Sequence, residues 1–381
     1  MNILFLSHEY PPLGGGGANA CRNLALQFAK HGHTVHIVTS GYGNLPEREC
    51  LEGGKIIIDR VKAKRKNCDH SNVSEMLDYL HKAYRLLGSA TWMQHFDICL
   101  CFFGIPSGPL ALHLKKKYGV PYIIRFGGGD IPGFQDRFAV LYKLLSPELQ
   151  RIWKNADALI ANSAGLQKYA LDYCSKYPVE VIPNGVDTER FSPIDESLKG
   201  DTFRLLTVCR LIKRKGLQDV IPFIKPLEQD TGKSIRWTIV GDGPYREDLE
   251  KLAVEWGCHE KIKFLGERAQ SELPHLYHDA DLFVFPSHRE GMPNAVLEAM
   301  ASGLPVIMRK DCQGSFELIH NNGISSDENF IRDLKDLIHR TSPELKSMGE
   351  RSRQIVIDRF TWECVFRQYE DVIKQVTNHD T

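Results

Sequence analysis

Short apolar runs alternate with helical stretches along the whole chain. In the first half these runs are NILFLS, TVHIVTS, KIIIDRV, DICLCFF, PYIIRF and ALIANS, and in the second half they are FRLLTVCR, IRWTIVGDG, KIKFLGE, DLFVFPS and PVIMRK. Continuous apolar strands separated by helices are typical of a parallel sheet that is covered on both faces. The two series therefore predict two doubly wound α/β domains.

A polar segment, FSPIDESLKGD, separates the two series and has the Pro, Gly and Ser content of a linker. We place the N-terminal domain at residues 1–195 and the C-terminal domain at residues 196–360. Residues 361–381 carry aromatic and aliphatic side chains at helical spacing, which predicts a docked C-terminal helix. Open parallel sheets bind ligands beyond the carboxyl ends of their strands, so we expect the chemistry in the loops there, at a cleft between the domains.

Composition and charge narrow the possible partners. The 48 Lys and Arg residues balance the 48 Asp and Glu residues, which gives no argument for nucleic acid. No run approaches the roughly 18 to 20 apolar residues of a membrane span, and the N-terminus is typical of a buried strand rather than a signal peptide. We expect a cytoplasmic protein. The basic stretch KAKRK at residues 62–66 is either a solvated loop or a peripheral contact with the inner membrane face.

Neither cysteine nor histidine spacing indicates a metal site. The chain has 10 cysteines and 15 histidines, without the spacings of metal ligands or redox motifs. Cys99 and Cys101 fall on the same side of a predicted strand, where we expect them to pack in the core. We therefore expect no metal.

The window PSHREGMPNAVLEAMASGLPVI, residues 286–307, contains the most informative chemistry. A loop carries Glu290, and Gly291, Met292, Pro293 and Asn294 lead from it into a helix that Gly303 should end. Backbone amides at the start of a helix suit a diphosphate or sugar hydroxyls. Glu298 can lean back over the same ligand, and a carboxylate that accepts two hydroxyls suits a ribose or hexose diol. The alternative is that both acids are solvated.

The segment VCRLIKRKG places Arg210 and Lys215 on the loop after a strand. A diphosphate leaving group gains negative charge as a glycosidic bond breaks, and fixed cations stabilise that late charge. We expect Lys213 and Arg214 to be solvated.

Three glycine-rich turns are further candidates. Gly14 to Gly17 follow the first strand, but their spacing is not GxGxxG, which argues against NAD. Gly241 and Gly243 either let a nucleoside approach the backbone or simply form a turn. Asp130, in FGGGDIPGF, either touches substrate or caps a turn.

Taken together, these segments resemble glycosyltransferase family 4, the retaining glycosyltransferases of GT-B fold. The resemblance is carried by PPLGGGGANACRNLALQFAKHGHTVHIVT, VIPNGVDTERF, VCRLIKRKG, IVGDGP and the E-x7-E window EGMPNAVLE. It implies two Rossmann-like domains, with a donor in the C-terminal one and an acceptor in the N-terminal one. It also implies metal-independent transfer of a hexose from a UDP- or GDP-linked sugar to a glycan, glycolipid or small molecule, in cell-surface polysaccharide or glycolipid biosynthesis. The nucleotide sugar is a co-substrate, and no cofactor is expected.

The resemblance also assigns roles to residues. Glu290, Arg210 and Lys215 are the catalytic candidates, and Glu298 would hold the ribose. The other donor-binding candidates are Gly291, Met292, Pro293, Asn294, Gly16, Gly17, Gly241 and Arg268. Many relatives carry a histidine where this chain has RFGGGD, so Asp130 is the acceptor-side candidate, and KDCQGSFELIHNNG replaces a glycine-rich stretch of the family. The C-terminal helix would cross back to the N-terminal domain.

Two other functions stay open. A GT-B-like sugar-nucleotide epimerase would convert a sugar nucleotide without an acceptor, and a catalytically silent protein would only bind it. Nucleotide release that requires an acceptor separates transfer from both.

Overall fold

The computed structural model describes residues 1–68, 71–89, 95–134, 139–194, 202–288, 290–312 and 314–378. The chain forms two compact units: unit 1 is Met1–Asn184 with Trp362–Thr381, and unit 2 is Gly185–Thr361. The boundary that the sequence placed at 195/196 lies outside the described residues. In the structure the chain passes into unit 2 earlier, after Asn184.

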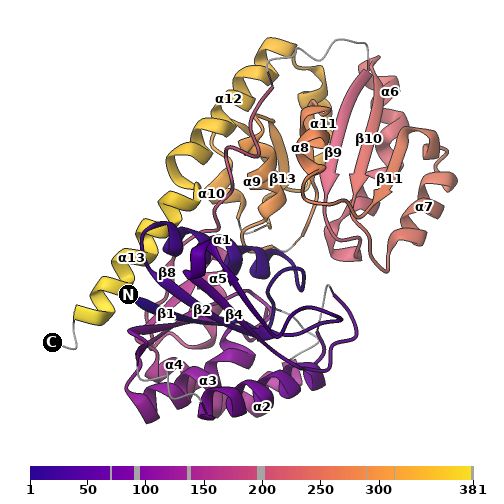
Figure 1. The fold of residues 1–381 in the computed structure, drawn as a ribbon. Coiled ribbons are helices and arrows are strands. Elements are labelled where there is room, and N and C mark those ends of the chain that lie inside the picture. Colours follow the sequence, from indigo (N-terminus) through magenta and orange to yellow (C-terminus); the bar gives the residue numbers. More distant parts are fainter. Residues whose placement is uncertain are drawn as a thin grey trace. The chain divides into compact units, whose positions relative to one another are not determined.

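Unit 1 is built on one sheet, which among the described residues has eight strands (Figure 1). The strands are β1 (Asn2–Leu6), β2 (Thr34–Ser40), β3 (Arg48–Leu51), β4 (Ile56–Val61), β5 (Ile98–Phe102), β6 (Tyr122–Arg125), β7 (Ala158–Ala161) and β8 (Glu180–Val181). Their order is β3-β4-β2-β1-β5-β6-β7-β8, and only the edge strand β3 pairs antiparallel. The first strand is fully buried from its second residue onward, as its unbroken apolar sequence predicts.

Helices cover both faces of this sheet. They are α1 (Gly16–Lys30), α2 (Val73–Ser89), α3 (Gly104–Tyr118), α4 (Ala139–Asn155), α5 (Ala164–Tyr173) and α13 (Trp362–Asn378). One apolar core joins the sheet to α2, α3, α4 and α5, and the other joins it to α1 and α13. Phe366 of α13 packs edge-on against Phe28 of α1 with ring centroids 5.1 Å apart, so the C-terminal helix is part of the core of unit 1.

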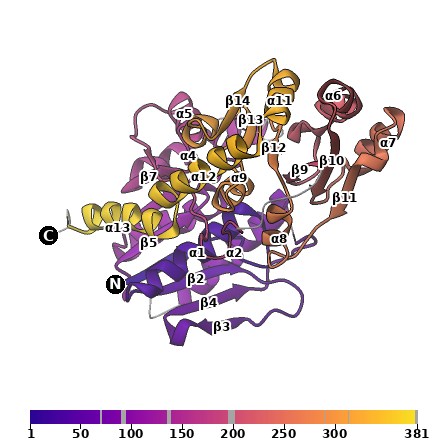
Figure 2. The same ribbon diagram turned by 90° about the horizontal axis from the view of Figure 1, so that it is seen from above.

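Unit 2 repeats this architecture with a parallel sheet. Its described strands are β9 (Thr202–Val208), β10 (Ser234–Val240), β11 (Ile262–Gly266), β12 (Leu282–Phe285), β13 (Val306–Arg309) and β14 (Gly323–Ser326), in the order β11-β10-β9-β12-β13-β14 (Figure 2). Its helices are α6 (Ile224–Thr231), α7 (Arg246–Glu255), α8 (Leu273–His278), α9 (Asn294–Ala301), α10 (Ser315–Leu318), α11 (Phe330–His339) and α12 (Ser342–Arg359). Single 3-10 turns are η1 (Glu52–Gly54) in unit 1 and η4 (Lys213–Lys215), η5 (Leu217–Asp219), η6 (Ile221–Phe223) and η7 (His259–Lys261) in unit 2.

The prediction of two doubly wound parallel-sheet domains is confirmed, and each apolar run contains a strand. The sequence did not indicate β3, β8 and β14, because these strands are short, lie at sheet edges or carry polar residues, as in RECL and GISS. Cys99 and Cys101 are both buried in one core of unit 1 with their sulfurs 4.0 Å apart, which confirms the packing interpretation. Within the described ranges, no helix combines the length and apolar character needed to cross a membrane.

Candidate active site

The switch point of the unit 2 sheet lies between β9 and β12. These strands are neighbours, yet the segment after β9 packs in one core of the unit and α9, which follows β12, packs in the other. Chain segments that leave adjacent parallel strands toward opposite faces open a crevice at the carboxyl ends of the strands, where α/β proteins bind ligands. The loop after β9 carries Arg210 and Lys215 and the loop after β12 carries Glu290, so all three catalytic candidates lie on the loops at this switch point.

Lys215 and Glu290 form a direct ion pair across these two loops. The Lys215 ammonium nitrogen lies 2.7 Å from Oε1 of Glu290, and the two side chains are only 12% and 16% exposed. The Ser287 hydroxyl donates to the same oxygen at 2.9 Å, and the Arg214 guanidinium lies 3.6 Å from it. Lys215 also lies over the ring of Phe285, 5.2 Å from its centroid. The predicted cation and the predicted carboxylate are thus preorganised together.

The charge of Glu290 is set by opposing influences. Burial alone would raise the pKa of its carboxyl, but the positive charges of Lys215 and Arg214 and the hydrogen bonds from Lys215 and Ser287 outweigh burial. The net pKa of Glu290 lies below its ordinary value. Glu290 is therefore a carboxylate at neutral pH.

A glycine holds the two loops together. Gly216 has φ = 70°, and a Cβ on it would lie 2.1 Å from the carbonyl oxygen of Pro286 at the end of β12. A side chain here would both strain the backbone and push the loops apart. Lys215 is consequently fixed against the strand whose loop carries Glu290.

The second carboxylate, Glu298, lies on α9 and is half-buried. The Tyr277 hydroxyl, from α8, donates to its Oε2 at 2.8 Å. Burial raises the pKa of Glu298 to about 7, against the opposing effects of the Tyr277 hydrogen bond and the charge of Arg190. The alternative that Glu298 is a solvated surface acid is wrong.

The segment between the two acids packs as part of the unit. Met292 is buried in the core cluster around α9, and Pro293 precedes the helix, which begins at Asn294. Gly303 follows the helix end and donates its backbone N–H to the carbonyl of Met300 at 3.0 Å, so the predicted helix stop is confirmed.

Other unit 2 candidates have different surroundings. Arg210 and Arg268 are exposed, in the loops after β9 and β11. Gly241 has φ = 122°, and a Cβ on it would lie 2.0 Å from the carbonyl oxygen of Cys209, so packing against the β9 loop already requires glycine there. Lys213 is exposed, as expected, but the expectation that Arg214 is merely solvated is wrong because its guanidinium approaches Glu290. Sequence reasoning missed the roles of Arg214, Ser287 and Tyr277. The only signal for Arg214 and Ser287 was that they lie in the motif segments, and Tyr277 had no signal at all.

The unit 1 candidates lie on loops that follow β1 and β6. Gly16 is the first residue of α1, and Gly17 approaches the ring of Phe103. Asp130 is buried, and its carboxylate accepts the backbone N–H groups of Gly104 at 2.7 Å and Gly127 at 2.8 Å. Burial raises the pKa of Asp130 despite these hydrogen bonds. The carboxylate thus caps turns, and its role toward an acceptor stays a prediction.

The basic stretch at residues 62–66 is not uniformly solvated. The Arg65 side chain is only 2% exposed and lies 3.0 Å from the carboxylate of Glu9, whereas Lys62, Lys64 and Lys66 are exposed. Among the described residues, no group of three or more His, Cys, Asp or Glu side chains is arranged to hold a metal ion.

Two family models match the chain in succession. Residues 14–190 match the model of Glycosyltransferase Family 4, and residues 189–355 match the model of Glycosyl transferases group 1. The chain belongs to glycosyltransferase family 4, and it is a glycosyltransferase.

Individual relatives agree with this family. The amylovoran biosynthesis glycosyltransferase AmsK of Erwinia amylovora is 27% identical over 302 residues, which cover 74% of this chain and 70% of that protein. The sucrose-phosphate synthase of Thermosynechococcus elongatus superposes with a TM-score of 0.81 at 19% identity, covering 99% of each chain. The Anabaena protein HepE, solved in complex with UDP and glucose, superposes with a TM-score of 0.75 at 18% identity, covering 98% of this chain and 100% of that one. These superpositions show that the fold is GT-B, as predicted.

Proposed function

We propose that this protein transfers a hexose from a UDP- or GDP-linked sugar to a glycan or lipid-linked acceptor, with retention of the anomeric configuration and without a metal ion. Unit 2 binds the donor and unit 1 binds the acceptor. The observation that carries this proposal is the Lys215–Glu290 pair, with Arg214 beside it, at the switch point of the unit 2 sheet.

The pair supports transfer because it combines a fixed cation with a carboxylate. An ammonium group has three donors, and Glu290 takes one, so Lys215 can also donate to the oxygens of a leaving diphosphate. Charge on those oxygens grows as the sugar bond breaks, and a preorganised cation stabilises the transition state more than the ground state. Lys215, Arg210 and Arg214 then do the work that a divalent cation does in other transferases.

Glu298 supports nucleotide binding. Tyr277 holds its Oε2, which turns the carboxylate into a fixed acceptor for the two hydroxyls of a ribose. Gly291, Met292, Pro293 and Asn294 would contact the sugar through the turn before α9.

The relatives support the biological context. AmsK is named for the biosynthesis of a polysaccharide, and HepE was solved with UDP and glucose. We place this enzyme in cell-surface polysaccharide or glycolipid biosynthesis at the cytoplasmic side of a membrane, where the exposed Lys62, Lys64 and Lys66 can contact anionic headgroups.

A donor screen followed by a transfer assay tests this function. Thermal shift against UDP- and GDP-sugars identifies the donor, because a ligand that binds the native state stabilises it by RT ln(1 + [L]/Kd). The purified enzyme is then incubated with that donor, with and without lipid-linked acceptors, in EDTA. We expect acceptor-dependent release of nucleoside diphosphate and an NMR spectrum that shows the donor's anomeric configuration in the product.

Each part of the proposal has its own contrary result. Conversion of the sugar nucleotide without an acceptor would make the protein an epimerase, and binding without release would make it catalytically silent. Loss of activity in EDTA that magnesium or manganese restores would overturn metal independence.

A further inference from the structure

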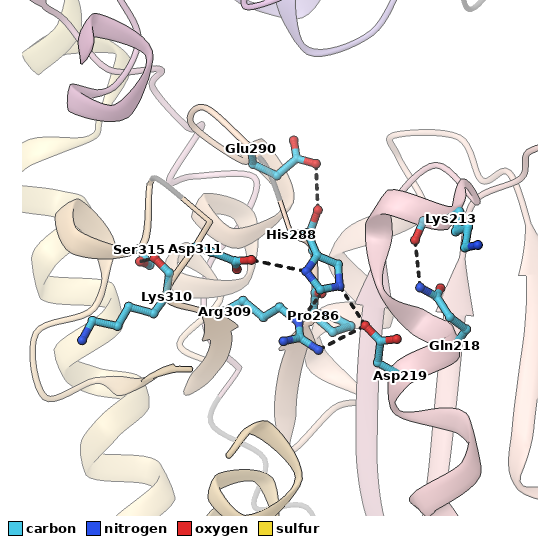
Figure 3. Close-up of polar contacts among 11 residues, drawn as sticks. Lys213, Gln218, Asp219, Pro286, His288, Glu290, Arg309, Lys310, Asp311 and Ser315 are labelled. Carbon is cyan, nitrogen blue, oxygen red and sulfur yellow. Dashed lines mark hydrogen bonds and ion pairs between the residues drawn. The ribbon is translucent and has the colours of Figure 1, made fainter. Parts of the chain in front are cut away.

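His288 lies two residues before Glu290, and its imidazole stands between two carboxylates (Figure 3). Its Nε2 lies 2.8 Å from Oδ2 of Asp219 on η5, and its Nδ1 lies 3.3 Å from Oδ2 of Asp311 after β13. Its backbone N–H donates to the carbonyl of Arg214 at 3.0 Å. One residue therefore joins the segments that follow β9, β12 and β13.

Arg309 strengthens the same junction. Its guanidinium donates to Oδ2 of Asp219 at 3.1 Å and, through Nε, to the carbonyl of Pro286 at 3.1 Å (Figure 3). Asp219, the acid nearest to Lys215 in sequence, is thus paired with His288 and Arg309, and Lys215 is paired with Glu290.

We propose that His288 is a positioning residue for the Lys215–Glu290 pair. This inference rests on the proposed function. The ion pair spans two loops, and His288 ties these loops to each other through its backbone N–H and its contact with Asp219. Its contact with Asp311 ties them to the loop after β13. Without the ring, the β12 loop keeps its covalent ends but loses two of the contacts that fix where Glu290 meets Lys215.

The expected signature is a loss of turnover without a loss of nucleotide affinity. Displacing a reacting group by about 1 Å costs roughly a hundredfold in rate, so a loosened loop should cost about 10- to 100-fold in kcat. Glu298 and Tyr277 lie on α9 and α8 and hydrogen-bond to each other rather than to His288, so UDP or GDP should bind the variant within about twofold of wild type. A residue that only supported folding would lower both quantities together.

The two contact distances rank a series of substitutions. A glutamine amide nitrogen occupies nearly the position of Nε2, and an asparagine amide nitrogen nearly that of Nδ1. Because the Asp219 contact is the shorter one, we expect kcat to fall in the order wild type, His288→Gln, His288→Asn, His288→Ala. His320→Ala, an exposed histidine of the same unit, is the matched control and should behave as wild type.

Hydrogen exchange of the nucleotide-free enzyme gives a readout that does not need activity. Peptides covering residues 213–219 and 286–292 should exchange faster in His288→Ala than in wild type or His320→Ala. Asp311→Asn decides the question if His288→Ala does not fold, because the Asp311 side chain is 56% exposed and its loss should lower kcat by less, in the same direction.

The proposal is overturned by unchanged kcat in His288→Ala and Asp311→Asn, by wild-type exchange in both peptides, or by kcat and nucleotide affinity falling in parallel. A wild type that shows no transfer would defeat the proposed function instead, and the exchange experiment would still judge the role of His288.

Discussion

The two units share one architecture but place different chemistry at the switch points of their sheets. In unit 1 the switch point lies between β1 and β5, where the ring of His8 packs edge-on against Phe103 with centroids 5.0 Å apart. Burial and the charge of Arg65 lower the pKa of His8 to about 3, so this ring is neutral. In unit 2 the corresponding point carries the Lys215–Glu290 pair with Arg214.

This difference separates fold from function. A doubly wound sheet provides a crevice at its switch point whatever side chains line it. At the switch point of unit 1 the neutral ring of His8 packs against Phe103. At the switch point of unit 2 the side chains are charged. A diphosphate gains most from the second kind of lining, which is why we assign the donor to unit 2.

Removing Lys215 is the most direct test of whether the charged switch point of unit 2 is needed for turnover. We expect Lys215→Ala to lower kcat about a hundredfold, because loss of one preorganised electrostatic contact costs roughly a hundredfold to a thousandfold and Arg210 and Arg214 compensate in part. Donor affinity should change much less. Steady-state kinetics on the purified variant measure both.

Lys213→Ala is the matched control for this experiment. Lys213 is exposed on the same 3-10 turn, and its loss should leave the kinetics nearly unchanged. If the variants at Lys213 and Lys215 had equal effects, the charge at the switch point would act only as a diffuse field. A rise in the donor KM alone would make Lys215 a uniform binding residue.

The sequence predicted the architecture of both units, and it singled out the candidate residues that the structure brings together in unit 2, because each depends on local patterns. Apolar runs report strands, and EGMPNAVLE and VCRLIKRKG each lie within one loop and its flanks. Tyr277 is 21 residues from Glu298 and Asp219 is 69 residues from His288, so their contacts exist only after the helices and loops pack. Asp130 shows the converse limit, since its sequence context fits a substrate contact and a turn cap equally well, and the structure adds the amide contacts of Gly104 and Gly127 that support the cap.

Glu298, the second carboxylate of unit 2, tests whether unit 2 binds the nucleotide. We expect Glu298→Ala to weaken UDP or GDP binding at least about tenfold while the fold remains intact, since a charge-assisted hydrogen bond contributes about 1.5 to 3 kcal/mol. Calorimetry measures the affinity, and Glu250→Ala is the control, because the Glu250 side chain on α7 is 44% exposed. Unchanged affinity in Glu298→Ala would exclude the ribose role.

The pH dependence of nucleotide binding follows from the same residue. Hydroxyls donate best to the ionised carboxylate, so wild-type affinity should decline as pH falls through about 7, and Glu298→Gln should remove this decline. The stability of the nucleotide-free protein should change with pH in the opposite direction to nucleotide affinity. Because burial raises the pKa of the folded state above that of the unfolded chain, stability gained at acid pH is lost as pH rises through about 7. A flat wild-type affinity profile would contradict this assignment.

The smallest effect concerns the glycines at the switch point of unit 1. A Cβ on Gly17 would lie 2.5 Å from the Cζ of Phe103, whereas a Cβ on Gly15, at the start of the same helix, meets nothing within 4 Å. We expect Gly17→Ala to destabilise the protein by about 1 to 3 kcal/mol, because Phe103 must shift within packed surroundings. Gly15→Ala meets no such clash and should cost less, about 0.5 kcal/mol, because it replaces the N-cap glycine of α1 by the poorer cap alanine. Denaturant unfolding of both variants measures this difference. Kinetics then decide what the glycines are for: if Gly17→Ala keeps its stability but loses activity, the glycine serves a close approach of the donor phosphates rather than the packing of Phe103. If stability falls while donor affinity and kcat are retained at saturating donor, the glycine-rich turn of unit 1 is a packing device, and the contrast with the charged crevice of unit 2 holds.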